Sequence, residues 1–282
     1  MSRPAELPVP PVDAVMPHTA MLWFGGASVV LSAFCFAAGL HLARRERRPF
    51  PLLLPVAGMC TVVLEATVCH LGHCWHPVVG QWTLYTSNGV SVPVYLAFSY
   101  CFYFSGLFLV AYPLISKGRL TGRHLWRLYG GGCVMASVVE IYVMRTNLWI
   151  YYGPQALWLW KGTLPLWWVF TNVACILLAL TLVAVFYPVL TGWKQLLVLP
   201  LSPLGAYMGH LAVGAPYYLL IGSNAGADQT LVELSGIASL ALALLVVAGC
   251  GHVLTLQRRI TSHERANPAA VPEPAAPVTA QG

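Results

Sequence analysis

The fold is organised around residues 138–154, which read VVEIYVMRTNLWIYYGP. Within this stretch, Glu140 lies in an apolar run and is followed by Arg145 and by a cluster of aromatic residues. A carboxylate at membrane depth is costly unless it faces a partner or a wet cavity. Glu140 is therefore a candidate functional residue, and the rest of the chain can be read as the scaffold that places it.

The composition excludes an ordinary soluble domain. Of the 282 residues, 58% are hydrophobic and only 9% are charged, and the mean hydropathy is +0.70. These values predict a multi-pass protein of the cell membrane. The net charge of +6 comes from short basic clusters between apolar runs, a pattern typical of membrane topology. We therefore expect membrane lipid, and no nucleic acid, among the partners.

Seven apolar runs, each near the ~20 residues that cross the hydrocarbon core, predict an all-α fold with seven transmembrane helices. The runs cover residues 21–43, 50–72, 91–115, 125–144, 164–190, 195–222 and 229–256. The expected domains are a flexible N-terminal lead (1–20), the seven-helix transmembrane domain (21–257) and a disordered cytoplasmic tail (258–282).

The loops between these runs predict the orientation. Twelve of the fifteen Lys and Arg residues follow the first, third, fifth and seventh runs. That side is expected to be cytoplasmic, which places the N-terminus outside and the C-terminus in the cytoplasm. The opposite loops are rich in aromatic residues, which either form an interfacial belt or cover a cavity that opens outward.

A weak internal repeat connects the candidate residues. Glu65 and Glu140 lie 75 residues apart, and residues 92–95 (VPVY) and 164–167 (LPLW) lie 72 apart. One further step of this spacing leads to His210 in the sixth run. At 1.5 Å per helical residue, the three ionisable groups are expected at a similar depth in the outer half of the bilayer.

Glu65 and Glu140 are the acids that lie well inside the predicted spans. Two carboxylates in one apolar cavity can divide the roles of proton donor and proton acceptor. Acid-triggered cyclisation or isomerisation of an apolar substrate needs both roles. The alternative is that Glu140 pairs with Arg145, or that either carboxylate only joins neighbouring helices.

Aromatic side chains and one amide could form the wall of a substrate site. Such rings can enclose an extended apolar or cationic intermediate, or they can belong to an interfacial belt. The candidates are Trp75, Trp82, Trp149, Tyr151, Trp167, Trp168 and Asn172.

Residues 69–76 hold the densest set of possible metal ligands, which are Cys69, His70, His73, Cys74 and His76. His70 and His73 have a suitable helical spacing, and His210 could add a third ligand. Nothing else completes a recognised set, and interfacial hydrogen bonding of these His residues is the favoured interpretation. We therefore predict no metal, although a metal-dependent membrane oxidoreductase using His70, His73 and His76 remains a third hypothesis.

Two segments carry a resemblance to a known family. The first comprises Glu140, Arg145, Thr146, Asn147, Leu148, Trp149 and Tyr151, and the second is Leu164-Pro165-Leu166-Trp167. Their pattern resembles the AveC-like membrane spirocyclase family, the avermectin-type spiroketal cyclase relatives. The chain departs from the family at Trp168, where the family has an acid, and in the His-, Cys- and Trp-containing loop 69–89, which suggests a different substrate or reaction.

The resemblance implies a cofactor-independent cyclase that acts on a hydrophobic polyketide or isoprenoid intermediate, with pathway enzymes as possible partners. Glu140 would be the general acid, Arg145 would orient it, Glu65 would be the second acid or base, and His210 would relay protons. Seven-span terpene cyclases offer an analogy of architecture only. A non-enzymatic transporter or sensor for a lipid or small molecule is the alternative function.

Overall fold

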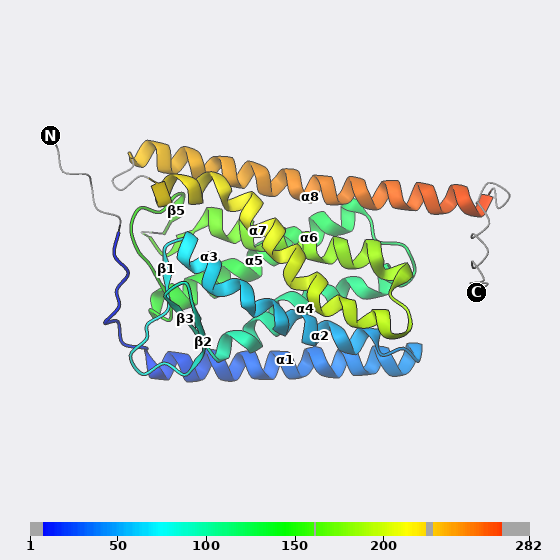
Figure 1. Cartoon of the computed structure of the whole chain (residues 1–282), viewed down its shortest axis with the longest axis horizontal. Helices are drawn as coiled ribbons and strands as arrows, with labels where there is room; N and C mark the ends of the chain where they lie inside the picture. The colour runs from blue at the N-terminus through cyan, green and yellow to red at the C-terminus, as the bar shows by residue number, and fades with distance from the viewer. Residues whose placement is uncertain (1–7, 161, 224–227, 267–282) are drawn as a thin grey trace, which may run out of the picture.

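The helices of the computed structural model run side by side along its long axis (Figure 1), and the structure describes residues 8–160, 162–223 and 228–266. The α-helices are α1 (His18–Glu46), α2 (Phe50–Cys60), α3 (Glu65–Leu71), α4 (Tyr95–Ile115), α5 (Gly122–Arg145), α6 (Leu166–Phe186), α7 (Val198–Ser223) and α8 (Gln229–Ala266). Short 3₁₀ segments are η1 (Thr61–Leu64), η2 (Tyr187–Val189) and η3 (Gly192–Leu197). Because η1 joins α2 directly to α3, the second predicted span is one continuous helical segment with a 3₁₀ turn in its middle.

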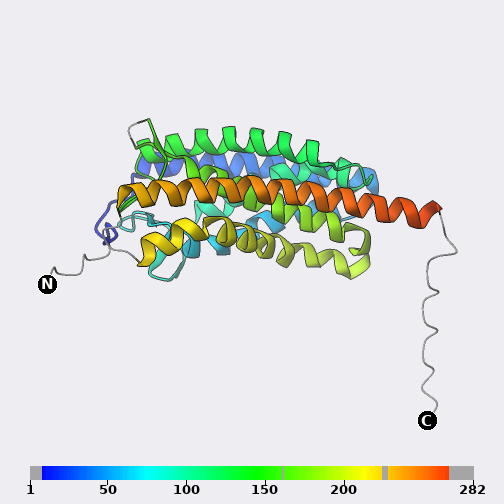
Figure 2. The same ribbon diagram turned by 90° about the horizontal axis from the view of Figure 1, so that it is seen from above.

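Six helical segments are long and apolar enough to cross a membrane, which confirms a helical, multi-pass architecture. They are His18–Glu46, Phe50–Leu71, Tyr95–Ile115, Leu166–Val189, Gly192–Gly222 and Gln229–Ile260. The remaining predicted span corresponds to α5, which lies in the same bundle and packs against α6 and α8 (Figure 2). Its lower apolarity reflects Arg123, Arg127, Glu140 and Arg145.

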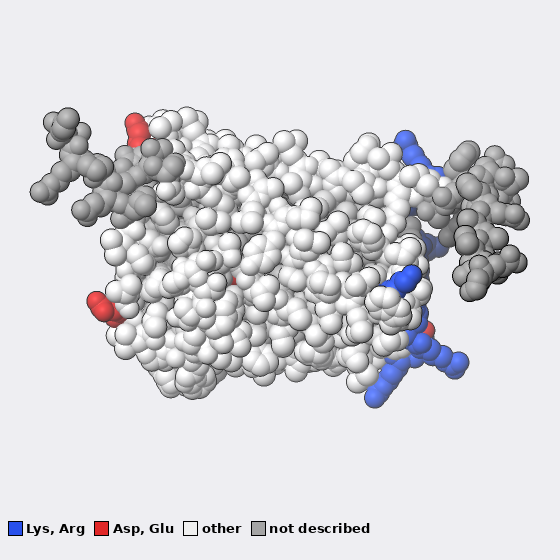
Figure 3. Space-filling model, in the orientation of Figure 1, with Lys and Arg blue, Asp and Glu red and all other residues white. Residues whose placement is uncertain are grey.

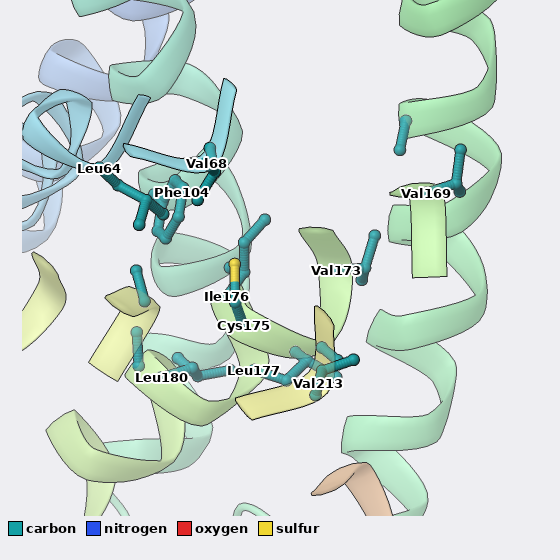
Figure 4. Packing of buried hydrophobic residues seen from close by; sticks show 14 of the residues in the cluster. Leu64, Val68, Phe104, Val169, Val173, Cys175, Ile176, Leu177, Leu180 and Val213 are labelled. Carbon is teal, nitrogen blue, oxygen red and sulfur yellow. The ribbon is translucent and has the colours of Figure 1, made fainter. Parts of the chain in front are cut away.

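Helix α6 occupies the centre of the bundle and contacts α4, α5, α7 and α8. Its side chains are buried around most of the helix, as expected for a helix that is apolar on every face. Val173, Ile176, Leu177 and Leu180 are buried there, and Leu177 lies beside Val213 of α7 (Figure 4). The outer helices α1 and α8 instead expose large apolar residues, which suits contact with lipid.

Glycines on α7 allow it to approach α6 closely. A Cβ atom at Gly205 would lie 2.5 Å from the Cα atom of Ala179, and one at Gly209 would lie 2.7 Å from the Cα atom of Cys175. Small residues four apart are a common solution for tight helix packing in membranes. The close approach places His210, the next residue of α7, against α6.

Three short antiparallel ribbons lie at one end of the bundle and were not predicted. They pair β1 (Cys74–Trp75) with β4 (Ile150–Tyr151), β2 (Thr83–Ser87) with β3 (Val90–Pro93), and β5 (Trp158–Leu159) with β6 (Leu164–Pro165). The first ribbon aligns Cys74 with Tyr151 and Trp75 with Ile150. It therefore ties together the two loops that follow Glu65 and Glu140.

Lys and Arg side chains gather at the opposite end of the bundle, where α8 ends (Figure 3). Arg48, just before α2, and Tyr187, just after α6, meet at this end. Arg48 Nη1 donates a hydrogen bond to Tyr187 Oη at 3.2 Å. The two ends of the bundle thus differ strongly in charge, as the loop composition predicts.

The terminal segments differ in part from the expectation. Met16 in the predicted flexible lead is buried, its N–H donates to the carbonyl of Val79 at 2.9 Å, and the helix already begins at His18. Helix α8 continues to Ala266, so the first part of the predicted tail 258–282 is helical. Residues 1–7 and 267–282 lie outside the described residues.

Candidate functional site

A cavity lies in the half of the bundle next to the ribbons. Its empty volume, the opening included, is about 730 Å³. Six α-helices (α1, α3, α4, α5, α6 and α7) and the two loops that pair as β1 and β4 contribute side chains, most of them apolar or aromatic. The polar and titratable ones are Glu65, Cys74, Ser99, Tyr100, Tyr103, Glu140, Trp149, Tyr151, Asn172, Cys175 and His210.

Glu140 projects from the last part of α5 and is 3% exposed. Its carboxylate accepts a hydrogen bond from Trp149 Nε1 at 3.2 Å and from Tyr151 Oη at 3.3 and 3.2 Å to its two oxygens. Asn147 adopts a left-handed backbone conformation (φ 55°), which turns the chain back after α5 and brings both donors over the carboxylate. The carboxylate is thus held by two neutral donors in a low-dielectric site.

Glu65 lies at the start of α3 and faces the same cavity. Tyr100 of α4 donates to its Oε2 at 2.6 Å, while His76 Nε2 and Cys69 Sγ contact its Oε1 at 2.8 and 3.3 Å. Burial opposes a charge on His76, but its contacts with Cys69 and Glu65 outweigh burial and raise its pKa to about 10. Glu65 and His76 therefore form a buried ion pair.

His210 on α7 is fixed through both ring nitrogens. Its Nε2 lies 2.8 Å from Oδ1 of Asn172, and its Nδ1 lies 2.7 Å from the hydroxyl of Tyr218. An amide oxygen can only accept, so Nε2 carries the proton and Nδ1 accepts from Tyr218. This network holds a neutral imidazole in one tautomer at the wall of the cavity, where its ring meets Trp168 edge to face at 5.2 Å.

The structure brings most of the predicted residues together. Seven of them line the one cavity: Glu65, Glu140, Trp149, Tyr151, Trp168, Asn172 and His210. The premise that the carboxylates of two helices face a common chamber agrees with this arrangement.

Four predicted residues lie elsewhere. Arg145 is exposed and makes no ion pair with Glu140, because five residues turn the helix by about 140° to its other side. Trp167 packs on Tyr217 with ring centroids 3.9 Å apart, whereas its neighbour Trp168 faces the cavity. Trp75 is buried but does not line the cavity, and Trp82 is 57% exposed. Contrary to the expectation, neither residue belongs to the cavity wall.

Two tyrosines were missed by the sequence reasoning. Tyr100 binds Glu65, and Tyr103 lines the cavity with a buried hydroxyl that has no hydrogen-bond partner among the described residues. Their spacing of three places both on one side of α4, and this pair of hydroxyls inside an apolar run is the signal that could have identified them.

The candidate metal ligands named from the sequence do not converge as one set. His70 is exposed, and His73 stacks on Tyr152 with ring centroids 5.0 Å apart. The possible ligand atoms that converge are those of Glu65, Cys69 and His76, all within 4.8 Å of one another. His210 belongs to the separate network with Asn172 and Tyr218.

The fold and the site together define a polytopic helical membrane protein with a buried, acid-lined cavity. The comparisons add no family to this description: no family model, no curated protein and no solved structure matches the chain.

Proposed function

We propose that the protein is an integral-membrane cyclase or isomerase for a hydrophobic polyketide or isoprenoid (terpenoid) intermediate in natural-product biosynthesis. One observation carries the proposal: Glu65 and Glu140, from different helices, line a single cavity whose other walls are largely apolar and aromatic. A buried carboxylate is expensive, and two of them on one void suggest proton chemistry.

In the proposed topology α5 is a seventh span, which places the N-terminus outside and the C-terminus in the cytoplasm of a cell-membrane protein. The 24 residues of α5 correspond to about 36 Å of helix, enough to cross the hydrocarbon core. The basic end of the bundle then faces the cytoplasm, and the cavity lies toward the external face.

The proposed mechanism is proton-in, proton-out. Glu140, in its acid form, donates a proton to an oxygen or double bond of the folded substrate. A second electron-rich group of the same molecule then forms the ring bond, and a proton leaves the product to Glu65. One proton enters and one leaves, so the reaction is an isomerisation that consumes no cofactor.

The remaining cavity residues support this chemistry by position. Trp149 and Tyr151 hold the Glu140 carboxyl group, and Tyr100 and His76 hold that of Glu65. Faces of Trp168, Tyr103 and Phe104 can stabilise positive charge that develops on the substrate. His210 is proposed to position Asn172 toward the substrate, in place of the relay expected from the sequence.

The resemblance to the AveC-like spirocyclases is kept as part of the proposal. Of its motif, Glu140, Trp149 and Tyr151 lie on the cavity, whereas Arg145 is exposed. The proposal therefore assigns the holding of Glu140 to the two aromatic donors and gives Arg145 no part in the reaction.

The test is conversion of candidate polyketide and terpenoid precursors by the purified protein, compared with uptake of the same compounds into proteoliposomes. Conversion that falls about 100-fold or more in Glu140→Gln, at unchanged protein level, supports the enzyme. Glu233→Gln is the matched control, because Glu233 bonds the N–H of Leu157 outside the cavity. Uptake without conversion would show that the protein is a transporter, which is the alternative function.

A further inference from the structure

Three side chains beside the cavity present their ligand atoms to a common point. They are Glu65 through Oε1, Cys69 through Sγ and His76 through Nε2. We propose that this cluster binds one divalent transition-metal ion, with Zn²⁺ as the foremost candidate, and leaves a fourth coordination position open toward the cavity.

The distances between the ligand atoms suit a tetrahedral ion. Cys69 Sγ lies 3.3 Å from Glu65 Oε1 and 3.5 Å from His76 Nε2, and the third edge, from Nε2 to Oε1, is 2.8 Å. Zinc bonds of ordinary length give tetrahedron edges of about 3.3 to 3.7 Å. Two edges already have this length, and the third lengthens when the ion replaces the proton shared by His76 and Glu65.

The fold determines the convergence of these atoms. Glu65 and Cys69 are four residues apart on α3, so both point to the same side of one helical turn. His73 adopts a left-handed backbone conformation (φ 51°) that ends the helix, and the pairing of Cys74 with Tyr151 fixes the returning strand. His76 is thereby brought back over the turn that carries the other two ligands.

The donor set and its charge also favour such an ion. Sulfur, imidazole nitrogen and carboxylate oxygen together are typical zinc ligands, and three protein ligands with an open position are typical of catalytic zinc sites. A thiolate, a carboxylate and a neutral imidazole around a divalent ion sum to zero charge, which suits a site where Glu65 is 9% and Cys69 0% exposed. Tyr100 binds the other carboxylate oxygen and would orient the ligand from outside.

Cys74 indicates the direction of the open position. It interacts with Cys69 and, like Glu65, lines the cavity, yet it does not belong to the group whose ligand atoms all lie within 4.8 Å. Because Glu65 and Cys74 both border the space that Glu140 also borders, the proposal places the uncoordinated side of the ion toward it. A water molecule or a substrate oxygen can occupy it.

This inference rests on the proposed function and narrows its substrate class. An ion opposite Glu140 would polarise a carbonyl or hydroxyl oxygen, so the preferred intermediate carries oxygen at the reacting end. With the ion bound, Glu65 would act as a ligand, and water on the ion would accept the proton that Glu65 accepts in the metal-free scheme above.

The first test is the zinc content of protein purified without metal-affinity resin, measured by mass spectrometry. Wild type and Cys101→Ala, the control at a buried cysteine of α4, are expected to hold about one ion per chain. Cys69→Ala keeps the Glu65–His76 pair and is expected to lose about tenfold or more of the metal. Equal metal in Cys69→Ala and wild type would show an adventitious ion only and overturn the site.

The second test needs no variant. Wild-type protein loaded with Co²⁺ should show a thiolate-to-cobalt charge-transfer band, and absence of the band after loading would also overturn the site. Glu140→Gln should retain the metal while losing conversion. Full metal without any conversion by wild type therefore refutes the enzyme alone, and conversion that survives complete metal removal refutes the ion's part in the reaction alone.

Discussion

The imidazole of His76 and the indole of Trp149 meet edge to face, with ring centroids 5.8 Å apart and planes at 85°. His76 binds the carboxylate of Glu65, and Trp149 binds that of Glu140. The two acidic groups are thus joined through a pair of rings that come from two paired loops. A displacement of either loop affects both carboxylates.

Removal of the indole N–H of Trp149 tests whether its hydrogen bond holds the carboxylate of Glu140. Trp149→Phe keeps a ring against His76 but takes the hydrogen bond from Glu140, and we expect turnover to fall roughly tenfold with a stability loss of about 1 kcal/mol. Tyr151→Phe should have a similar effect, since Tyr151 reaches both carboxylate oxygens. Turnover assays and thermal melts in detergent measure both. Wild-type turnover in the variant that combines Trp149→Phe and Tyr151→Phe would refute the proposal that these two side chains hold Glu140 in place.

Replacement of the exposed arginine separates the structure from the family resemblance. Arg145→Gln should leave turnover and melting temperature unchanged, because the side chain lies on the surface of α5 away from Glu140. Kinetic assays with the substrate that wild type converts provide the measurement. A loss as large as that of Glu140→Gln would support the orienting role expected from the sequence.

Tyr103 offers a probe of substrate contact. Its hydroxyl is buried in the cavity wall and unpartnered among the described residues, so Tyr103→Phe should not destabilise the fold and should remove a cost of burial. We expect KM to rise while kcat changes little, as for the loss of a contact made equally to substrate and transition state. An unchanged KM would place the substrate away from α4.

The close approach of α6 and α7 should be sensitive to a single methyl group. Gly209→Ala places a Cβ atom 2.7 Å from the backbone of Cys175, and the resulting shift of α7 should cost about 1 to 3 kcal/mol and loosen His210 from Asn172. Gly249→Ala is the control, since no atom lies within 4 Å of its Cβ position. It should be neutral or stabilise by up to about 1 kcal/mol. Equal melting temperatures for the two variants would contradict the packing.

The sequence was sufficient for the scaffold and for half of the site. Apolar runs locate the helices because lipid leaves the backbone few alternatives, and buried ionisable groups are rare enough to be noticed. Glu65, Glu140 and His210 were expected at a similar depth, and all three line one cavity. Hydropathy gives depth but not rotation, however, which is why Arg145 was placed beside Glu140.

The loops could not be predicted from hydropathy. Pairing of Cys74 with Tyr151 depends on contacts between distant segments, and it decides that His76, rather than His70, reaches Glu65. One local signal was overlooked: Asn88-Gly89 is typical of a two-residue hairpin turn, and both residues have positive φ between β2 and β3.

The central claim is that Glu65 and Glu140 serve one reaction in one chamber, and the most direct test is a double-mutant cycle on turnover. When two residues act as a unit, replacing both lowers turnover little more than the more damaging single replacement does. We predict that Glu65→Gln with Glu140→Gln is about as slow as the slower single variant. A double variant whose loss equals the product of the two single losses would contradict the account, because it would show that the two carboxylates act independently.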